Sequence, residues 1–233
     1  MLTELTIGDI GIDVVLKDIK NVHLSVYPPT GRVRISAPLN SNLDTLRIYA
    51  ISKLSWIRRN QTKLQNQARE TPREYLERES HYVWGKRYLL KIVDVETAAR
   101  VELKHSQLIM YVRPNTQTHQ MQAILDAWYR EQLKNSVPEF IEKWQKLMGV
   151  SVNNFYIQKM KTKWGSCNAE SRNIRLNSEL AKKPVEYLEY VIVHEMTHLL
   201  EPTHNSRFVY LMEQLMPKWK TYRDQLNQLP LQG

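Results

Sequence analysis

The sequence of 233 residues contains a single cysteine, Cys167, so no disulfide bond can form within the chain. One free thiol is compatible with a reducing compartment, and we expect a cytoplasmic protein. No apolar run approaches the roughly 20 residues that a bilayer-spanning helix needs, so no membrane association is expected. Residues 1–16 lack a basic segment and an unbroken apolar stretch, which argues against a signal peptide.

Acidic residues are fewer than basic ones, with 24 Asp and Glu against 33 Lys and Arg, and the formal charge is +9. Such an excess favours anionic partners, including nucleic acid and nucleotides. No basic block exceeds a few residues, so a basic solvated surface explains the charge equally well. Apolar residues make up 42% of the chain, which is typical of a globular protein with one or two domains.

Hydrophobic patterns predict an α+β protein whose β-rich N-terminal region spans residues 1–115. Residues 5–15 favour a strand, and residues 22–35 favour a hairpin around the turn Pro28-Pro29-Thr30-Gly31. Helical spacing predicts one long basic helix over residues 41–68, capped by Asn40 or Ser41. Closely spaced strands are expected again between residues 82 and 112. We see no internal repeat.

Residues 116–233 are predicted to form a second, largely helical domain with a small sheet. A helical period ends at Gly149, a residue suited to helix termination, and Pro138 is expected to kink or split this helix. Strand-like stretches at 154–160 and 173–176 flank a loop at 161–171. The chain from Pro184 onward is helical, with one expected interruption at Glu201-Pro202.

The segment His194-Glu195-Met196-Thr197-His198 lies within an apolar helical stretch. Residues four apart share one helix face, so His194 and His198 can present two imidazoles to one ion. Glu195 lies one residue further round, where it can reach a metal-bound water without binding the metal. This is the HExxH arrangement of zinc peptidases, with Glu195 as general base.

A catalytic zinc site needs a third protein ligand and one open position. His204 follows His198 by six residues, and Pro202 between them should end the helix and let the chain turn back. Glu213 is the competing third ligand. His204 is preferred, because Asn205 and Ser206 can start a new helix directly after it.

The histidines have two simpler interpretations. They could be ordinary packing or surface residues, but the spacing, the helix break and the adjacent glutamate agree with a metal site. They could also form a purely structural zinc site. Such sites are usually closed and rich in cysteine, and only Cys167 is available.

The loop at 161–171 is expected to lie beside the active site, within a hairpin formed by its flanking strands. Gly165 would permit a tight turn there, and Trp164 is interpreted mainly as a packing residue. Cys167 is interpreted as a small buried hydrophobic residue rather than a nucleophile. Several basic residues would give this hairpin a positive charge: Lys161, Lys163, Arg172 and Arg175.

Several motifs together resemble the YgjP-like metal-dependent hydrolases, which are relatives of the SprT-type zincins. The motifs are Trp128-Tyr129-Arg130, Lys159 to Cys167 with its Lys-Trp-Gly-Ser-Cys core, Ile174-Arg175-Leu176-Asn177 with Leu180 and Pro184, the HExxH segment with the preceding Tyr190-Val191-Ile192-Val193, His204-Asn205-Ser206 with Phe208, and Pro217-Lys218-Trp219. The resemblance implies a zincin-like, minigluzincin core over residues 116–233. It also implies a zinc cofactor at His194, His198 and His204, with Glu195 in the catalytic position.

Three functions follow from these observations. The leading one is a zinc-dependent metallopeptidase that acts on an extended polypeptide. The second is a zinc-dependent nucleotide pyrophosphatase, since one relative in the resembling family is described as acting on UTP. The third is a DNA-associated accessory protein with a vestigial or regulatory metal site. The sequence alone leaves the substrate and the oligomeric state open.

Overall fold

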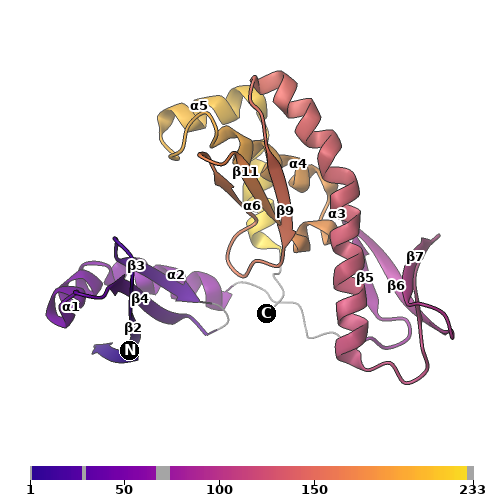
Figure 1. Cartoon of the computed structure of the whole chain (residues 1–233), viewed down its shortest axis with the longest axis horizontal. Coiled ribbons are helices and arrows are strands. Elements are labelled where there is room, and N and C mark those ends of the chain that lie inside the picture. Colours follow the sequence, from indigo (N-terminus) through magenta and orange to yellow (C-terminus); the bar gives the residue numbers. More distant parts are fainter. Residues whose placement is uncertain (1, 28–29, 67–73, 230–233) are drawn as a thin grey trace. The chain divides into compact units, whose positions relative to one another are not determined.

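A computed structural model of the protein describes residues 2–27, 30–66 and 74–229 (Figure 1). The chain divides into two compact units, which are residues 1–70 with 229–233, and residues 71–228. Both units combine helices with small sheets, so the predicted α+β class is confirmed. The predicted domain boundary at residue 115 lies inside the second unit.

The first unit is a four-stranded sheet followed by two helices. Its elements are β1 (Leu2–Ile7), β2 (Ile10–Lys17), β3 (His23–Tyr27), β4 (Arg32–Pro38), α1 (Leu43–Ser52) and α2 (Leu54–Asn66). The strand order is β1-β2-β4-β3, with β2 and β4 parallel and the other pairs antiparallel. The antiparallel pair β3 and β4 confirms the predicted hairpin. Pro28 and Pro29 of its turn lie outside the described residues.

The long helix predicted over residues 41–68 is divided into α1 and α2. The break occurs at Lys53, whose N–H donates to Ala50 O at 3.0 Å, a contact of the tighter 3₁₀ type. The spacing of apolar residues does not reveal this break, because apolar residues before and after Lys53 pack into the same core and keep the helical period. Ala50 and Ile57 are both fully buried there with the sheet residues. Residues 67 and 68 lie outside the described part of the chain.

The second unit begins with a sheet that repeats the topology of the first. Its strands are β5 (Ser80–Val83), β6 (Lys86–Asp94), β7 (Arg100–Lys104) and β8 (Gln107–Val112). The order β5-β6-β8-β7 has the same parallel central pair and the same antiparallel outer pairs as the first sheet. The chain therefore contains a repeated four-strand arrangement that the sequence pattern did not reveal.

Backbone contacts join this second sheet to the helical part of the chain. The N–H groups of Trp84 and Gly85, in the β5–β6 turn, donate to Ala181 O at 2.8 Å and Lys182 O at 3.2 Å. Both acceptors lie in the short 3₁₀ helix η1 (Ser178–Lys182). These bonds explain why the compact unit begins before residue 115, since β5 to β8 share contacts with the later helices.

Helix α3 (Thr118–Met148) continues through Pro138, so of the two expected effects, a kink or a split, the split is excluded. It ends at Gly149, whose φ of 65° is the left-handed conformation expected of a terminating glycine. The third sheet contains β9 (Asn154–Gln158), β10 (Gly165–Asn168) and β11 (Asn173–Asn177) in the order β10-β11-β9. The flanking strands β9 and β11 pair in parallel rather than as a hairpin, because the intervening loop itself supplies β10.

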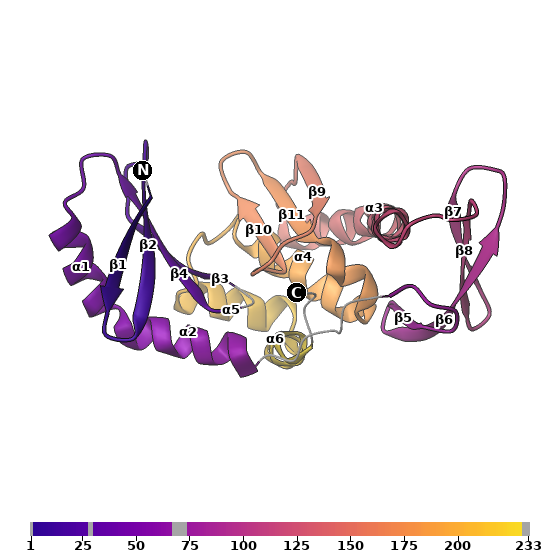
Figure 2. The same ribbon diagram turned by 90° about the horizontal axis from the view of Figure 1, so that it is seen from below.

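Three further helices complete the second unit: α4 (Val185–Thr197), α5 (Ser206–Leu215) and α6 (Trp219–Gln228). Figure 2 shows the third sheet beside α4, which packs against β10 and β11. A second interruption, between α5 and α6, was not predicted. Among the described helices, none combines the length and the apolar character needed to span a bilayer.

Candidate metal centre

Helix α4 carries His194 in its last turn and ends at the cap residue His198. The four-residue spacing brings the two imidazoles to one face, with ring centroids 5.1 Å apart. Val191 and Ile192 are buried on the same helix and anchor it against the core. The local sequence therefore fixes two of the three predicted histidines on one rigid element.

His204 lies next to His194 and His198 because the end of α4 changes to 3₁₀-type hydrogen bonds and the chain then reverses direction. The N–H groups of Leu199 and Leu200 donate three residues back, to Met196 O and Thr197 O, each at 3.0 Å. The regular helix thus ends at Thr197, before the predicted stop at Pro202. The chain then turns, and His204 Nε2 lies 3.0 Å from the Nε2 atom of His194.

Helix α5 begins directly after His204, as predicted. The side chain of its cap residue Asn205 accepts a hydrogen bond from the Phe208 N–H at 3.0 Å. The cap holds Phe208, which is 1% exposed, against all three imidazoles, with ring centroids 4.7 to 5.0 Å away. Sequence reasoning missed this aromatic platform. The sequence feature that could have indicated it is an aromatic residue, Phe208, three positions after the predicted helix cap Asn205.

The three histidines have a donor set that fits a metal ion. Their ligand atoms all lie within 4.8 Å of one another. Two nitrogens bound to one tetrahedral zinc, each about 2.0–2.1 Å from the ion, are about 3.4 Å apart. The 3.0 Å between the Nε2 atoms of His194 and His204 is close to that spacing. Three imidazoles and no thiolate are typical of a catalytic zinc site.

The protonation of the rings suits the same role. Burial, followed by the neighbouring histidines, lowers the pKa of His194 to about 3, and burial also lowers the pKa of His198. Both rings are therefore neutral at physiological pH, the state in which an imidazole can bind a metal ion. His198 Nδ1 lies 3.2 Å from Glu201 O, and since a carbonyl oxygen only accepts, this nitrogen carries the proton and Nε2 keeps its lone pair for a metal ion. Edge contacts with Tyr190 and Phe208 orient His194.

Glu195 lies beside the cluster and is only 6% exposed. Burial raises the pKa of its carboxyl to about 8, and the nearby Lys163 ammonium opposes this rise. Gly165 packs so closely that an added Cβ would lie 2.6 Å from Glu195 Oε1. Gly165 was expected to serve a tight turn, but it begins β10 and instead makes room for this carboxylate.

The histidines and Glu195 line one cavity of about 590 Å³. Its walls include Lys163 and Trp164 before β10, and Tyr190, Arg223 and Leu226 from α4 and α6. Cys167 also lines the cavity, where burial and then the Glu195 charge raise its pKa to about 11. A thiol with this pKa is neutral and a poor nucleophile. Cys167 is half-buried at the cavity wall, and is not the fully buried residue that the sequence interpretation expected.

Glu213 does not join this arrangement. Its carboxylate binds the Lys220 ammonium at 2.6 Å on the surface of the second unit, and it is absent from the residues that line the cavity. The geometry therefore favours His204 over Glu213 as the third nitrogen or oxygen donor.

Strand β10 forms an edge of the third sheet and borders the cavity. Asn177 N–H donates to Trp164 O at 2.8 Å, which makes these two residues a hydrogen-bonded pair. Hydrogen-bonded and non-bonded pairs alternate along an antiparallel ladder. Ser166 therefore turns its backbone groups toward β11, whereas Gly165 and Cys167 direct theirs to the open edge.

Comparison with known proteins gives a family and two structural neighbours. The YgjP-like metallopeptidase domain matches residues 20–229. The crystal structure of the metallopeptidase zymogen of Pyrococcus abyssi abylysin is 22% identical, with a TM-score of 0.36, and the match covers 39% of this chain and 90% of that one. For the zymogen of Methanocaldococcus jannaschii jannalysin the identity is 20%, the TM-score 0.36 and the coverage 40% and 95%.

Among curated proteins, no relative matches the sequence. The family match includes all the residues of the candidate centre and most of both units. The chain therefore belongs to the YgjP-like metallopeptidase family.

Proposed function

We propose that the protein is a zinc-dependent peptidase that cleaves extended polypeptides. The observation that carries this proposal is the convergence of His194, His198 and His204 beside the buried carboxylate of Glu195. Family membership supports the same reaction class. The donor set supports zinc, because imidazole nitrogen is among its usual ligands.

In this proposal His194, His198 and His204 would hold the ion through ring nitrogens, and Glu195 transfers the protons. Zinc bound by neutral imidazoles supplies a Lewis acid that activates water for attack on a carbonyl carbon. Glu195 Oε accepts the proton of the attacking water and then delivers it to the leaving amine. Its buried position keeps competing solvent away from that carboxylate, and Gly165 fixes its place against β10.

A polypeptide substrate is favoured by the open edge of β10. The outward backbone groups of Gly165 and Cys167 match the spacing at which an added strand forms hydrogen bonds. An extended peptide on this edge would run along the cavity that Glu195 lines. This arrangement supports recognition through the main chain, with side-chain selectivity supplied by the cavity walls.

Activity assays on the wild type and on Glu195→Gln test the proposal. The zinc-loaded wild type should degrade casein, and a chelator should stop the reaction until zinc is restored. Glu195→Gln keeps nearly the same shape but cannot accept the proton, so we expect at least about a 100-fold loss of turnover with zinc still bound. Glu139→Gln, the same change on the exposed surface of α3, is the matched control.

Three outcomes would contradict the proposal. Full activity of Glu195→Gln would exclude its role as general base. Release of pyrophosphate from UTP without any cleavage of casein would assign a nucleotide substrate instead. Salt-sensitive DNA binding that survives His194→Ala, in a protein with neither activity, would favour the accessory role.

A further inference from the structure

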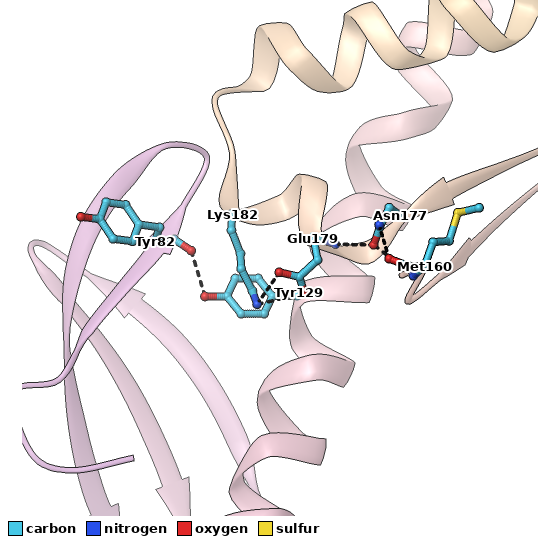
Figure 3. Close-up of polar contacts among 6 residues, drawn as sticks. All are labelled: Tyr82, Tyr129, Met160, Asn177, Glu179 and Lys182. Carbon is cyan, nitrogen blue, oxygen red and sulfur yellow. Dashed lines mark hydrogen bonds and ion pairs between the residues drawn. The ribbon is translucent and has the colours of Figure 1, made fainter. Parts of the chain in front are cut away.

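Asn177 lies at the end of β11 and is completely buried, with an exposed fraction of 0%. It also caps η1, because its Oδ1 atom accepts a hydrogen bond from Glu179 N–H at 3.2 Å. Figure 3 shows its side chain pointing away from Lys182 and toward Met160, which belongs to the segment between β9 and β10. A simple helix cap would need only the bond to Glu179.

All four hydrogen-bonding positions of the Asn177 amide are occupied. Oδ1 also accepts from Met160 N–H at 3.3 Å, and Nδ2 donates to Met160 O and to Lys163 O, each at 2.8 Å. An amide group offers two donors and two acceptors, so nothing is left over. The partners also fix the orientation of the amide, since two backbone N–H groups need oxygen and two carbonyls need nitrogen.

The segment held in this way leads directly into the wall of the candidate metal centre. Lys163 and Trp164 line the cavity, and Trp164 O accepts a further bond from Asn177 N–H at 2.8 Å. The next residue, Gly165, packs against Glu195 and begins the open edge of β10. One buried side chain thus determines where this wall starts.

We propose that Asn177 is a positioning residue, whose amide holds residues 160–164 so that the Lys163–Gly165 wall is set for substrate beside Glu195. The inference rests on the proposed peptidase function and deepens it. Asn177 does not touch the reacting atoms. It acts through the backbone that would bind the peptide, so it should govern substrate affinity more than zinc affinity or proton transfer.

The substitution Asn177→Asp separates this role from helix capping. Aspartate keeps an oxygen for the N–H groups of Met160 and Glu179, and it is an equally good cap. It lacks the NH₂ group, so at most one of the two loop carbonyls keeps a donor whatever the ionisation of the carboxyl. A capping role alone predicts a loop that is held as in the wild type, and a positioning role predicts a loosened loop. Asn42→Asp is the control for the cap chemistry at an exposed site, because Asn42 caps α1 only as an acceptor.

The first measurement is hydrogen exchange in the zinc-loaded full-length protein. Losing the donor to at least one of two part-buried loop contacts should raise exchange of the amides of residues 160–165 by about tenfold or more. Exchange in α4 and the zinc dissociation constant should stay at wild-type values, since the histidines lie on other elements. Wild-type exchange in the loop of Asn177→Asp would overturn the proposal.

The second measurement compares two zinc-binding probes, acetohydroxamate and a peptide hydroxamate that extends along β10. Asn177→Asp should weaken the peptide hydroxamate about tenfold and leave acetohydroxamate unchanged, and in peptide hydrolysis KM should rise while kcat stays within about threefold. Equal effects on both probes, or none, would reduce Asn177 to a structural residue. If the wild type cleaves no peptide, the proposed function fails, but the difference between the two probes still decides the role of Asn177.

Discussion

At the scale of single residues, the candidate site depends on very close packing between Glu195 and Gly165. An added Cβ at Gly165 would lie 2.6 Å from Glu195 Oε1 and 2.9 Å from a methyl group of Val191. Contacts under 3.0 Å force one of the groups to move, and Val191 is buried in α4. The general base of the proposed reaction therefore owes its position to the absence of a side chain.

The substitution Gly165→Ala should displace the Glu195 carboxylate while leaving the histidines in place. We expect kcat/KM for peptide hydrolysis to fall by about 100-fold, because small misplacements of a catalytic group have effects of that size. Overpacking should also cost about 1–3 kcal/mol of folding stability. In the control Gly11→Ala, the new Cβ meets only the flexible end of Glu4, at 3.2 Å. Unchanged activity of Gly165→Ala would show that this contact is unimportant.

The pH dependence of the metal-free protein should report the burial of Glu195. Its pKa in the folded chain, about 8, lies above the ordinary 4.5, so the folded state keeps a proton that the unfolded state has released. This contribution lowers the free energy of unfolding as the pH rises from about 4.5 to 8. Urea unfolding with a chelator present measures this free energy at pH 5 and at pH 8. Between the two pH values, the free energy of unfolding should fall more for the wild type than for Glu195→Gln, by a difference on the order of 2 kcal/mol. The same pH dependence of the free energy of unfolding in the wild type and in Glu195→Gln would contradict a raised pKa of Glu195.

At the scale of elements, β10 is the feature that links the candidate metal centre to the proposed peptide substrate. The sequence shows the HExxH spacing directly, because helical geometry alone places His194 beside His198. It also indicates the fresh helix after Asn205, since capping is local chemistry. It does not reveal β10, because four residues with mixed polarity carry little strand signal. The platform role of Phe208 was equally hidden, since it depends on how α5 packs against α4.

The alternation of backbone groups along β10 gives a prediction at this scale. Peptide substrates can be N-methylated on either of the two alternating sets of backbone amides. Methylation of the set that faces β10 should weaken binding, and methylation of the set that faces away should not. We expect KM to rise about tenfold when the methylated amide faces Gly165 or Cys167, the loss of one hydrogen bond. Methylation one residue away should have little effect. Equal tolerance at all positions would exclude strand addition as the mode of binding.

At the scale of the whole molecule, the candidate centre belongs to one of two compact units. All the residues that line the cavity lie between 163 and 227, within the second unit. The first unit has its own buried core, built from β1 to β4 with α1 and α2. Sequence periodicity predicted most of the helices. It placed the domain boundary at residue 115, whereas the second compact unit begins at residue 71. Hydrogen bonds such as that from Trp84 N–H to Ala181 O, which join the second sheet to the later helices, depend on tertiary structure and leave no periodic signal in the sequence.

Separate cores predict separate responses to metal. Calorimetry of the full chain should resolve two unfolding transitions, and zinc should raise the midpoint of only one of them. Substitution of His198 by Ala should abolish that shift and leave the other transition unchanged. A single transition that moves as a whole with zinc would mean that the two units unfold as one.

X-ray absorption at the zinc edge of the purified protein tests the central claim most directly. The account predicts one zinc ion per chain, with three imidazole nitrogens at about 2.0–2.1 Å and one further light-atom ligand. The signal of one imidazole should disappear in His204→Ala, and Cys167→Ser should leave the spectrum unchanged. A sulfur ligand at about 2.3 Å, or a protein that binds no zinc, would contradict a centre built from His194, His198 and His204.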